Sequence, residues 1–163
     1  MFIPEASERD MDQIEVFGRS LALLQSSRHC ALATVTELKP RVRAMEYAVD
    51  DAGVMYMLTE GGRKVRDILL NPPVSVSVWE SDAPAGLFWG LTITARAEVV
   101  DLGEKKRFDD YYEKYKQHIG RDMPKGDELP PRVKLIRVVP DMFELFNPSF
   151  RSEGFSSKQV WRR

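Results

Sequence analysis

Cysteine and histidine are scarce in this chain, and their scarcity removes several kinds of chemistry. The 163 residues include one cysteine, Cys30, and two histidines, His29 and His118. A lone cysteine excludes an intramolecular disulfide, and its place in an apolar run favours a buried, unreactive side chain. No cluster of Cys, His and carboxylates has the spacing of a metal site. We therefore expect no metal centre, and we expect His29 to be structural.

Several sequence motifs and segments are also missing. There is no Gly-x-Ser-x-Gly elbow and no P-loop, and together with the absence of a zinc site this gives little support to hydrolysis. No apolar run approaches the roughly 18 residues of a membrane span. The first residues, Met1-Phe-Ile-Pro-Glu, lack the basic flank and apolar stretch of a secretion signal. We therefore expect a cytoplasmic protein that does not bind membranes.

The overall composition predicts one globular domain. Hydrophobic residues make up 43% of the chain, which is enough to form a core. The formal net charge is −1 and the basic residues are dispersed, so we expect no nucleic-acid partner. The alternative is a small barrel that binds single-stranded nucleic acid, for which residues 157–163 would be the basic and aromatic cluster. We expect a domain at 1–147 and a C-terminal tail at 148–163, loosely held or docked on a partner subunit.

Hydrophobic periodicity predicts a mainly β protein with about three inserted helices. The helices are expected over 8–26, from Gly62 to Asn71, and over 103–120. A turn is expected at Lys39-Pro40, and a closing pair of strands on either side of Pro140. The strands are expected at 30–36, 41–49, 54–59, 74–80, 91–100, 132–139 and 142–147. Because strands and helices do not alternate, an antiparallel barrel with helices over its openings fits better than a parallel sheet.

The strand at 41–49 has two different faces. Because barrel interiors favour small apolar side chains, we expect Val42, Ala44 and Ala48 to face inward. The other face would then point outward, although it mixes cations with large apolar groups and so resembles a covered subunit contact. A plain solvated strand is the alternative interpretation. The residues of that outward face are Arg41, Arg43, Met45 and Tyr47.

The most informative segment is Thr59-Glu-Gly-Gly-Arg63-Lys64. Successive N–H groups in a glycine turn can converge on an anion. The first turn of the following helix adds unpaired N–H groups and a partial positive charge. Arg63 and Lys64 add two cationic donors. The segment therefore predicts a phosphate site, although a turn leading into a surface helix with two solvated cations would have the same sequence.

At this point the sequence resembles the FMN-binding split-barrel superfamily typified by pyridoxamine 5′-phosphate oxidase. The resemblance is strongest from Cys30 to about Val100, and it implies a split barrel that binds FMN at a homodimer interface. The motifs that carry it are Pro40-x-x-Arg43, the hairpin, Leu58-Thr59, Arg63-Lys64, Asn71-Pro72 and Val74-Ser75.

The resemblance also implies roles for individual residues. Arg63 and Lys64 would bind the phosphate, and Thr59 would form a hydrogen bond near the ribityl phosphate. The strand that Arg43 opens would line the ring and ribityl chain, largely through main-chain groups. The cofactor-binding residues implied are Arg43, Ala44, Met45, Glu46, Leu58, Thr59, Arg63, Lys64 and Trp89.

The sequence departs from the oxidase in three places. The glycine loop is one residue shorter, with Gly62 where serine is common. Gly90 stands where the oxidase has a glutamine that contacts the flavin. Trp89 would then either cover the flavin ring or serve as a packing residue. No Arg-x-His follows the closing strand, so we do not predict pyridoxamine phosphate oxidation.

We expect an FMN-dependent oxidoreductase of unassigned substrate. No catalytic acid or base is evident, and Arg43, Glu46 and Tyr47 are polar candidates near the ring. The alternatives are a non-catalytic flavin- or haem-binding module and a deazaflavin-dependent reductase on the same fold.

Overall fold

The computed structural model describes residues 8–80 and 82–163. The three predicted helices are present, and all strands belong to one sheet. Within the described ranges, none of the helices combines the length and the apolar character that crossing a membrane would need. The elements are α1 (Gln13–Ser26), β1 (His29–Thr36), β2 (Lys39–Glu46), β3 (Ala48–Val49), β4 (Met55–Thr59), α2 (Arg63–Leu70), β5 (Pro73–Trp79), β6 (Gly90–Asp101), α3 (Lys105–His118), the 3-10 helix η1 (Gly126–Glu128), β7 (Lys134–Phe146), the 3-10 helix η2 (Pro148–Glu153) and β8 (Lys158–Arg162).

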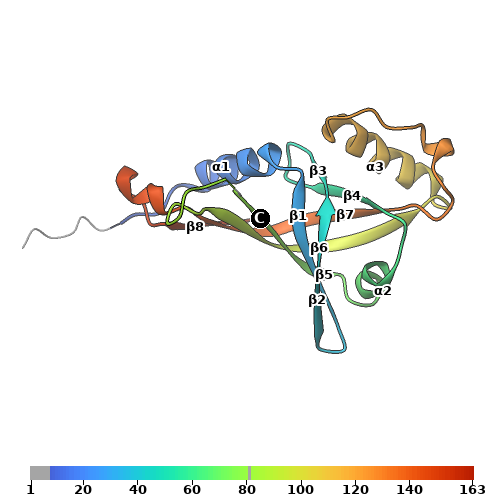
Figure 1. Ribbon diagram of the computed structural model, residues 1–163, viewed down its shortest axis with the longest axis horizontal. Coiled ribbons are helices and arrows are strands. Elements are labelled where there is room, and N and C mark those ends of the chain that lie inside the picture. The colour runs from blue at the N-terminus through green and yellow to red at the C-terminus, as the bar shows by residue number, and fades with distance from the viewer. Residues whose placement is uncertain (1–7, 81) are drawn as a thin grey trace, which may run out of the picture.

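The strands form an antiparallel split barrel, as predicted. Their order is β2-β1-β5-β6-β7-β4-β3, and β8 pairs with β7. Strands β2 and β3 are consecutive and separated only by Tyr47, yet they stand at opposite ends of this order. One bent segment therefore connects the two edges of the sheet. The hairpin of β1 and β2 crosses the long strands β6 and β7 and projects beyond them, with α2 beside it (Figure 1).

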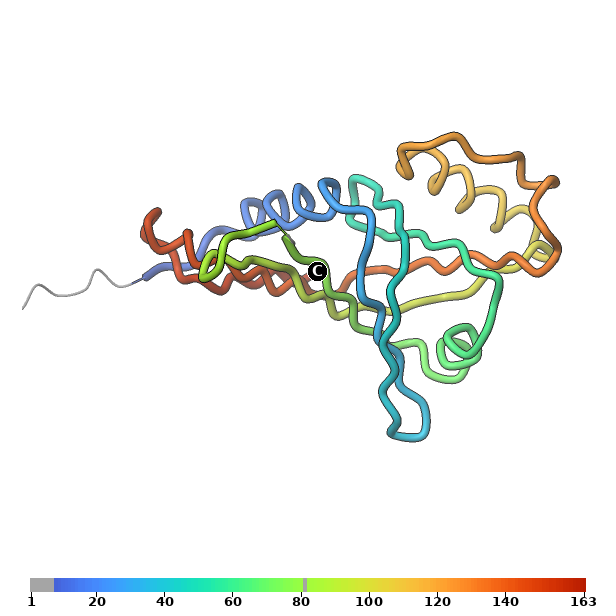
Figure 2. Tube along the Cα trace, viewed as in Figure 1, coloured from blue at the N-terminus to red at the C-terminus, as the bar shows by residue number. Residues whose placement is uncertain are grey.

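Two hydrophobic clusters hold the helices against the sheet. Helix α1 and Ile68 of α2 pack against the barrel interior, which contains Leu32, Met57 and Ile93. Helix α3 covers the outer surface of β3, β4 and β7 through a second cluster that contains Phe108 and Tyr112. Figure 2 shows that the chain passes from β4 into α2 and returns through β5, so α2 is a short excursion between two strands.

The facing of β2 differs from the prediction. Arg41 and Arg43 point toward α2 and bond side chains there and on β1, while Val42 is 67% exposed and Ala44 is exposed as well. The prediction that Val42 and Ala44 face inward was wrong, and Ala48 is buried under α3 rather than inside the barrel. The physical reason is that the arginines meet a buried carboxylate on α2.

Two predicted segment boundaries also change. The first hairpin turns at Glu37 and Leu38, both with positive φ, rather than at Lys39-Pro40. Pro40 instead lies in β2, the edge strand, where a missing N–H is tolerated. The closing strands form one strand, β7, in which Pro140 pairs with Ala95 and the next residue, Asp141, is skipped by a register shift.

The expected C-terminal tail, 148–163, forms the 3-10 helix η2 and then β8, which joins the sheet. Strand β8 pairs with the second half of β7, and the ring of Trp161 packs against that of Phe143 in a tilted arrangement, with 4.9 Å between the centroids. The side chain of Gln159 is 1% exposed. Its amide oxygen accepts a hydrogen bond of 2.7 Å from the N–H of Met11, which fixes the start of the described chain to β8.

This buried amide gives a direct stability test. Replacing Gln159 by Ala should lower the free energy of unfolding by about 1–3 kcal/mol, because the Met11 N–H would lose its partner in a dry site. Chemical denaturation with matched m-values measures the change. The neighbouring Lys158→Ala, an exposed substitution, should stay within about 0.5 kcal/mol of the parent. If Gln159→Ala destabilised the protein no more than Lys158→Ala, the hydrogen bond from Met11 to Gln159 would not contribute to stability.

Candidate functional site

A buried carboxylate on α2 organises the opening of the barrel. Asp67 is 2% exposed. Its oxygens accept hydrogen bonds of 2.8 Å from Thr34 and 2.9 Å from Thr36, both on β1. Arg41 approaches the same carboxylate at 3.3 Å and Arg43 at 3.7 Å. Helix α2 is therefore joined to both strands of the hairpin through one side chain.

The charge state of Asp67 follows from these contacts. Burial raises the pKa of its carboxyl group, but the hydrogen bonds from Thr34 and Thr36 and the charges of Arg41 and Arg43 outweigh it. The pKa is lowered overall. Asp67 is therefore an anion at neutral pH, and it compensates part of the positive charge of the two arginines.

Two cations converge beside this carboxylate. The Lys64 ammonium donates a hydrogen bond of 3.0 Å to the carbonyl of Gly61, and burial, followed by the nearby Arg43 charge, lowers its pKa. Arg43 also donates a hydrogen bond of 2.8 Å to Thr34. Within residues 8–80 and 82–163, no carboxylate forms an ion pair with Lys64. The geometry favours an anion at this place, because an anion would relieve the repulsion between the two cations.

The glycine turn leaves backbone donors free next to the same cations. Gly61 and Gly62 have φ angles of 103° and 87°, a backbone region that favours glycine. Gly62 is the N-cap of α2, and no side chain caps this helix end. Thr59 is 8% exposed and accepts a hydrogen bond of 3.3 Å from the Gly61 N–H. The predicted segment thus forms an uncapped helix start beside Lys64.

Arg63 lies on a different side of α2 from Lys64. It lines a small pocket of about 130 Å³. Successive residues of an α-helix point about 100° apart around its axis, so the side chains of Arg63 and Lys64 leave α2 in different directions. The pocket is lined by Thr36, Glu37, Arg41, Arg63, Arg66, Asp67 and Leu70.

The backbone of β2 has a free edge. In a two-residue hairpin the flanking pair, here Thr36 and Lys39, exchanges hydrogen bonds, so alternate residues turn their N–H and C=O groups away from β1. Ala44 and Glu46 are among these outward residues, while Met45 is directed into the core. The edge has no partner strand among the described residues. Its outward N–H and C=O groups can therefore form hydrogen bonds with the polar edge of a planar ligand.

The remaining predicted residues lie apart from this group. Leu58 packs under α3. Trp89 precedes Gly90, whereas Arg96 of the same strand pairs with Pro73 after α2, so Trp89 lies about 20 Å along the strand from that end. The structure brings Arg43, Thr59 and Lys64 together and does not bring Trp89 to them within one chain.

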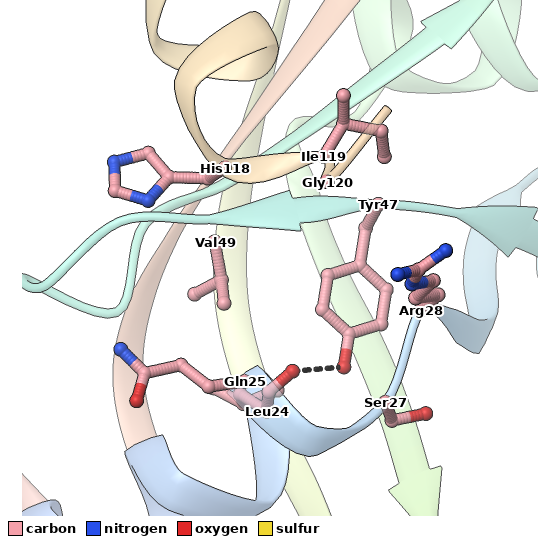
Figure 3. Close-up of a pocket in the computed structure, with 9 residues that line it drawn as sticks. All are labelled: Leu24, Gln25, Ser27, Arg28, Tyr47, Val49, His118, Ile119 and Gly120. Atoms are coloured by element: carbon pink, nitrogen blue, oxygen red, sulfur yellow. Dashed lines mark hydrogen bonds between the residues drawn. The ribbon is translucent and has the colours of Figure 1, made fainter. Parts of the chain in front are cut away.

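The side chains of Glu46 and Tyr47 form hydrogen bonds with residues outside this group. Glu46 accepts a hydrogen bond of 3.1 Å from Arg121 in the loop after α3. The Tyr47 hydroxyl donates a hydrogen bond of 2.7 Å to the carbonyl of Leu24 at the end of α1, and burial raises its pKa. Tyr47 is also in the wall of a separate pocket of about 240 Å³ (Figure 3). That pocket is lined by Leu24, Gln25, Ser27, Arg28, Tyr47, Val49, His118, Ile119 and Gly120.

Burial decides the character of the lone cysteine. Cys30 is 2% exposed, and burial raises the pKa of its thiol to about 12. The thiol is therefore protonated at neutral pH and unreactive. In the described part of the chain, no three His, Cys, Asp or Glu residues are grouped so that they could hold a metal ion.

Comparison with known proteins gives the family. The sequence model of pyridoxamine 5′-phosphate oxidase matches residues 19–146. This range covers most of the barrel, including β2, the glycine turn and α2. The chain belongs to the pyridoxamine 5′-phosphate oxidase family. None of the curated proteins matches the sequence at a significant level.

Solved structures share the fold at low sequence identity. A FAD-binding protein from Mesorhizobium loti superposes with a TM-score of 0.59 and 21% identity, over 83% of this chain and 94% of that chain. General Stress Protein 26 from Bacillus anthracis gives 0.60 and 18%, over 91% and 99%. ChuZ from Campylobacter jejuni gives 0.70 and 16%, over 94% and 62%. At these identities the solved structures support the assignment of the fold alone.

The Asp67 contacts predict a specific acid response. Because the folded pKa is lowered, the carboxylate contributes stability that is present above the ordinary aspartate pKa of about 3.9 and is lost as pH falls through the lower folded value. Asp67→Asn should destabilise the protein at pH 7, and the difference from the parent should shrink below about pH 4. Denaturation curves from pH 7 to pH 3 measure this. The exposed Asp122→Asn should show no such trend, and a pH-independent difference for Asp67→Asn would contradict the assignment.

Proposed function

We propose that this protein is a flavoprotein that binds FMN with the ribityl phosphate between Arg43 and Lys64, and that it acts as an oxidoreductase. The observation that carries the proposal is the pair of adjacent, half-buried cations without an acidic partner for Lys64. A phosphate monoester carries about −1.5 to −2 charges at neutral pH. It would balance both cations and accept hydrogen bonds from the uncapped start of α2.

The remaining predicted residues fit the rest of such a ligand. From Arg43, the free edge of β2 continues to Ala44 and Glu46. Their outward N–H and C=O groups suit the polar edge of a flavin ring, and the small side chain of Ala44 lets a ring approach the strand. Thr59 supports the glycine turn rather than facing an open cleft. Membership of the pyridoxamine 5′-phosphate oxidase family supports a flavin in this place.

The flavin would supply the hydride or electron chemistry, and the chain would supply binding and orientation. Lys64 and Arg43 would hold the phosphate, and the β2 edge would fix the ring. Glu46, the last residue of β2, is the acidic residue on that edge, and Arg121 holds its side chain. The substrate and the electron donor stay unassigned.

We further propose that the protein is a homodimer with this site at the subunit contact. Large apolar side chains are exposed on the hairpin and on α2, the two elements that carry the site. Apolar groups exposed in this way are typical of an interface. The side chains are Leu38, Val42, Leu69 and Leu70, with exposures of 94%, 67%, 66% and 67%.

Flavin titration tests the phosphate site. Replacing Lys64 by Gln should raise the dissociation constant for FMN about ten- to a hundredfold, because a hydrogen bond to a charged group contributes about 1.5–3 kcal/mol. Calorimetric titration of the purified chain measures the change. Lys114→Gln removes the same charge from the exposed surface of α3 and should leave the affinity unchanged. A Lys64 variant that binds FMN like the parent would remove this placement.

The dimer has its own test. Val42→Glu should convert the dimer into a monomer in analytical ultracentrifugation, because an interface would have to bury an unpaired carboxylate. The far-ultraviolet circular dichroism should not change, since the side chain is exposed in the monomer. Thr92→Glu, on an exposed position of β6, serves as the control. A parent protein that sediments as a monomer would contradict the proposal.

A further inference from the structure

The pocket of about 240 Å³ that contains Tyr47, here called the Tyr47 pocket, lies just past the free edge of β2 (Figure 3). Tyr47 follows Glu46, and its N–H donates a hydrogen bond of 2.9 Å to the carbonyl of Arg28, which also lines the pocket. In the loop after α3, Gly120 lines the pocket and the next residue, Arg121, bonds the Glu46 carboxylate. Glu46 is therefore the boundary between the β2 edge and the Tyr47 pocket.

The Tyr47 pocket has an apolar inner wall and a polar rim. Tyr47, Val49 and Ile119 are buried and form the inner wall. Arg28 and His118 are exposed, and they lie on opposite sides of the Tyr47 ring (Figure 3). The volume is below the roughly 300–1,000 Å³ of pockets for drug-sized ligands. The pocket therefore suits a small molecule, or one end of a larger one.

The close approach of Arg28 to the loop after α3 needs a glycine. One terminal nitrogen of the Arg28 guanidinium lies 3.2 Å from the position that a Cβ on Gly120 would occupy. Gly120 also has a φ of 75°, a backbone region that favours glycine. A side chain at position 120 would press on the guanidinium, so Gly120 leaves room for Arg28 at the rim of the pocket.

The charge of Arg28 is not cancelled at the pocket. Among the residues that the structure describes, no acidic side chain lines the Tyr47 pocket, and no carboxylate forms an ion pair with Arg28. The C-terminal end of α3, just before Gly120, carries a partial negative charge of about half an elementary charge. That partial charge offsets only part of one full positive charge. The rim of the pocket is therefore positive.

This combination suits a carboxylate better than a phosphate. A guanidinium group presents two parallel N–H donors that match the two oxygens of a planar carboxylate. One arginine balances the single charge of a carboxylate, whereas a phosphate monoester carries about −1.5 to −2 charges. The apolar inner wall of Val49 and Ile119 suits the carbon atoms that accompany a carboxylate in a small organic acid.

We propose that the Tyr47 pocket binds the carboxylate of a small organic acid, and that such an acid is the substrate class of the flavin site. Arg28 binds the carboxylate, and the carbon atoms contact the inner wall. The inference rests on the proposed function, because only a flavin along the β2 edge brings reactive chemistry next to this pocket. Glu46, at the boundary, is where the substrate and the flavin ring would meet.

Titration with benzoate and benzamide tests the pocket, because these probes share a shape and differ in charge. The purified, ¹⁵N-labelled full chain is titrated with each probe, and the amide resonances of Arg28 and Gly120 report binding. Benzoate should shift both resonances, and benzamide should bind at least tenfold more weakly. Arg28→Gln should weaken benzoate binding about tenfold, the lower end for a lost hydrogen bond to a charged group.

Arg151→Gln is the matched control, since it removes an arginine from η2, outside the pocket. It should leave benzoate binding unchanged. Arg28 and Arg151 are both exposed, so the melting temperatures of both variants should match that of the parent. Benzoate that binds Arg28→Gln like the parent, or no more tightly than benzamide, overturns the carboxylate site. Inorganic phosphate that shifts the same resonances at lower concentration than benzoate also overturns it.

Flavin measurements separate this inference from the proposed function. Arg28→Gln should bind FMN within twofold of the parent, because Arg28 lies outside the phosphate site. With FMN bound to the parent, benzoate should shift the visible absorption of the flavin. Benzoate binding without that shift overturns the assignment to the flavin's substrate and leaves the flavin site standing. A parent that binds no FMN overturns the proposed function and the substrate assignment, while the benzoate titration still decides the carboxylate site.

Discussion

The carboxylate of Asp67 is the contact on which the site depends. It is the one side chain of α2 that accepts hydrogen bonds from β1 and meets both arginines of β2. Without its charge, two guanidinium groups would lie unpaired at the mouth of the barrel, and α2 would pack there only through apolar contacts such as those of Ile68. The position of Lys64, three residues earlier on the same helix, follows from this attachment.

The same carboxylate divides the positive charge into two groups. Arg43 and Lys64 lie on one side, and Arg41 with the outer arginines of α2 lies on the other. Asp67 satisfies only part of this charge, so the hairpin and α2 together form a surface that attracts anions. The free edge of β2 begins at the same place. A ligand with a phosphate at one end and a planar, polar-edged ring at the other suits this combination.

Much of the fold was predictable from the sequence, because hydrophobic periods and turn residues are local signals. The alternation of β6 and the stop of α2 at Asn71 before Pro72 were confirmed. The facing of β2 was wrong because it depends on an ion pair between residues 26 positions apart. Nothing local to β2 reports that Asp67 will be buried there. The threonines at 34 and 36, which share one face of a predicted strand, were the available signal of a polar site.

The phosphate segment was recognised because glycine, helix start and cations are adjacent in sequence. Its partner Arg43 was known only through the family resemblance, and the structure now places it beside Lys64. The sequence pattern predicts an outward face for Arg41 and gives no signal for Arg66. Their proximity to Arg63 needs the three-dimensional crossing of the hairpin and α2. The proposed role of Trp89 stays a prediction that only a second subunit could satisfy, given its distance along β6.

A crystal structure of the chain with bound FMN tests the central claim most directly. The account predicts the flavin phosphorus between the Arg43 guanidinium and the Lys64 ammonium, with phosphate oxygens within hydrogen-bond distance of both groups and of the first N–H groups of α2. A structure in which the phosphate binds elsewhere, while Lys64 remains hydrogen-bonded only to the Gly61 carbonyl, would contradict it.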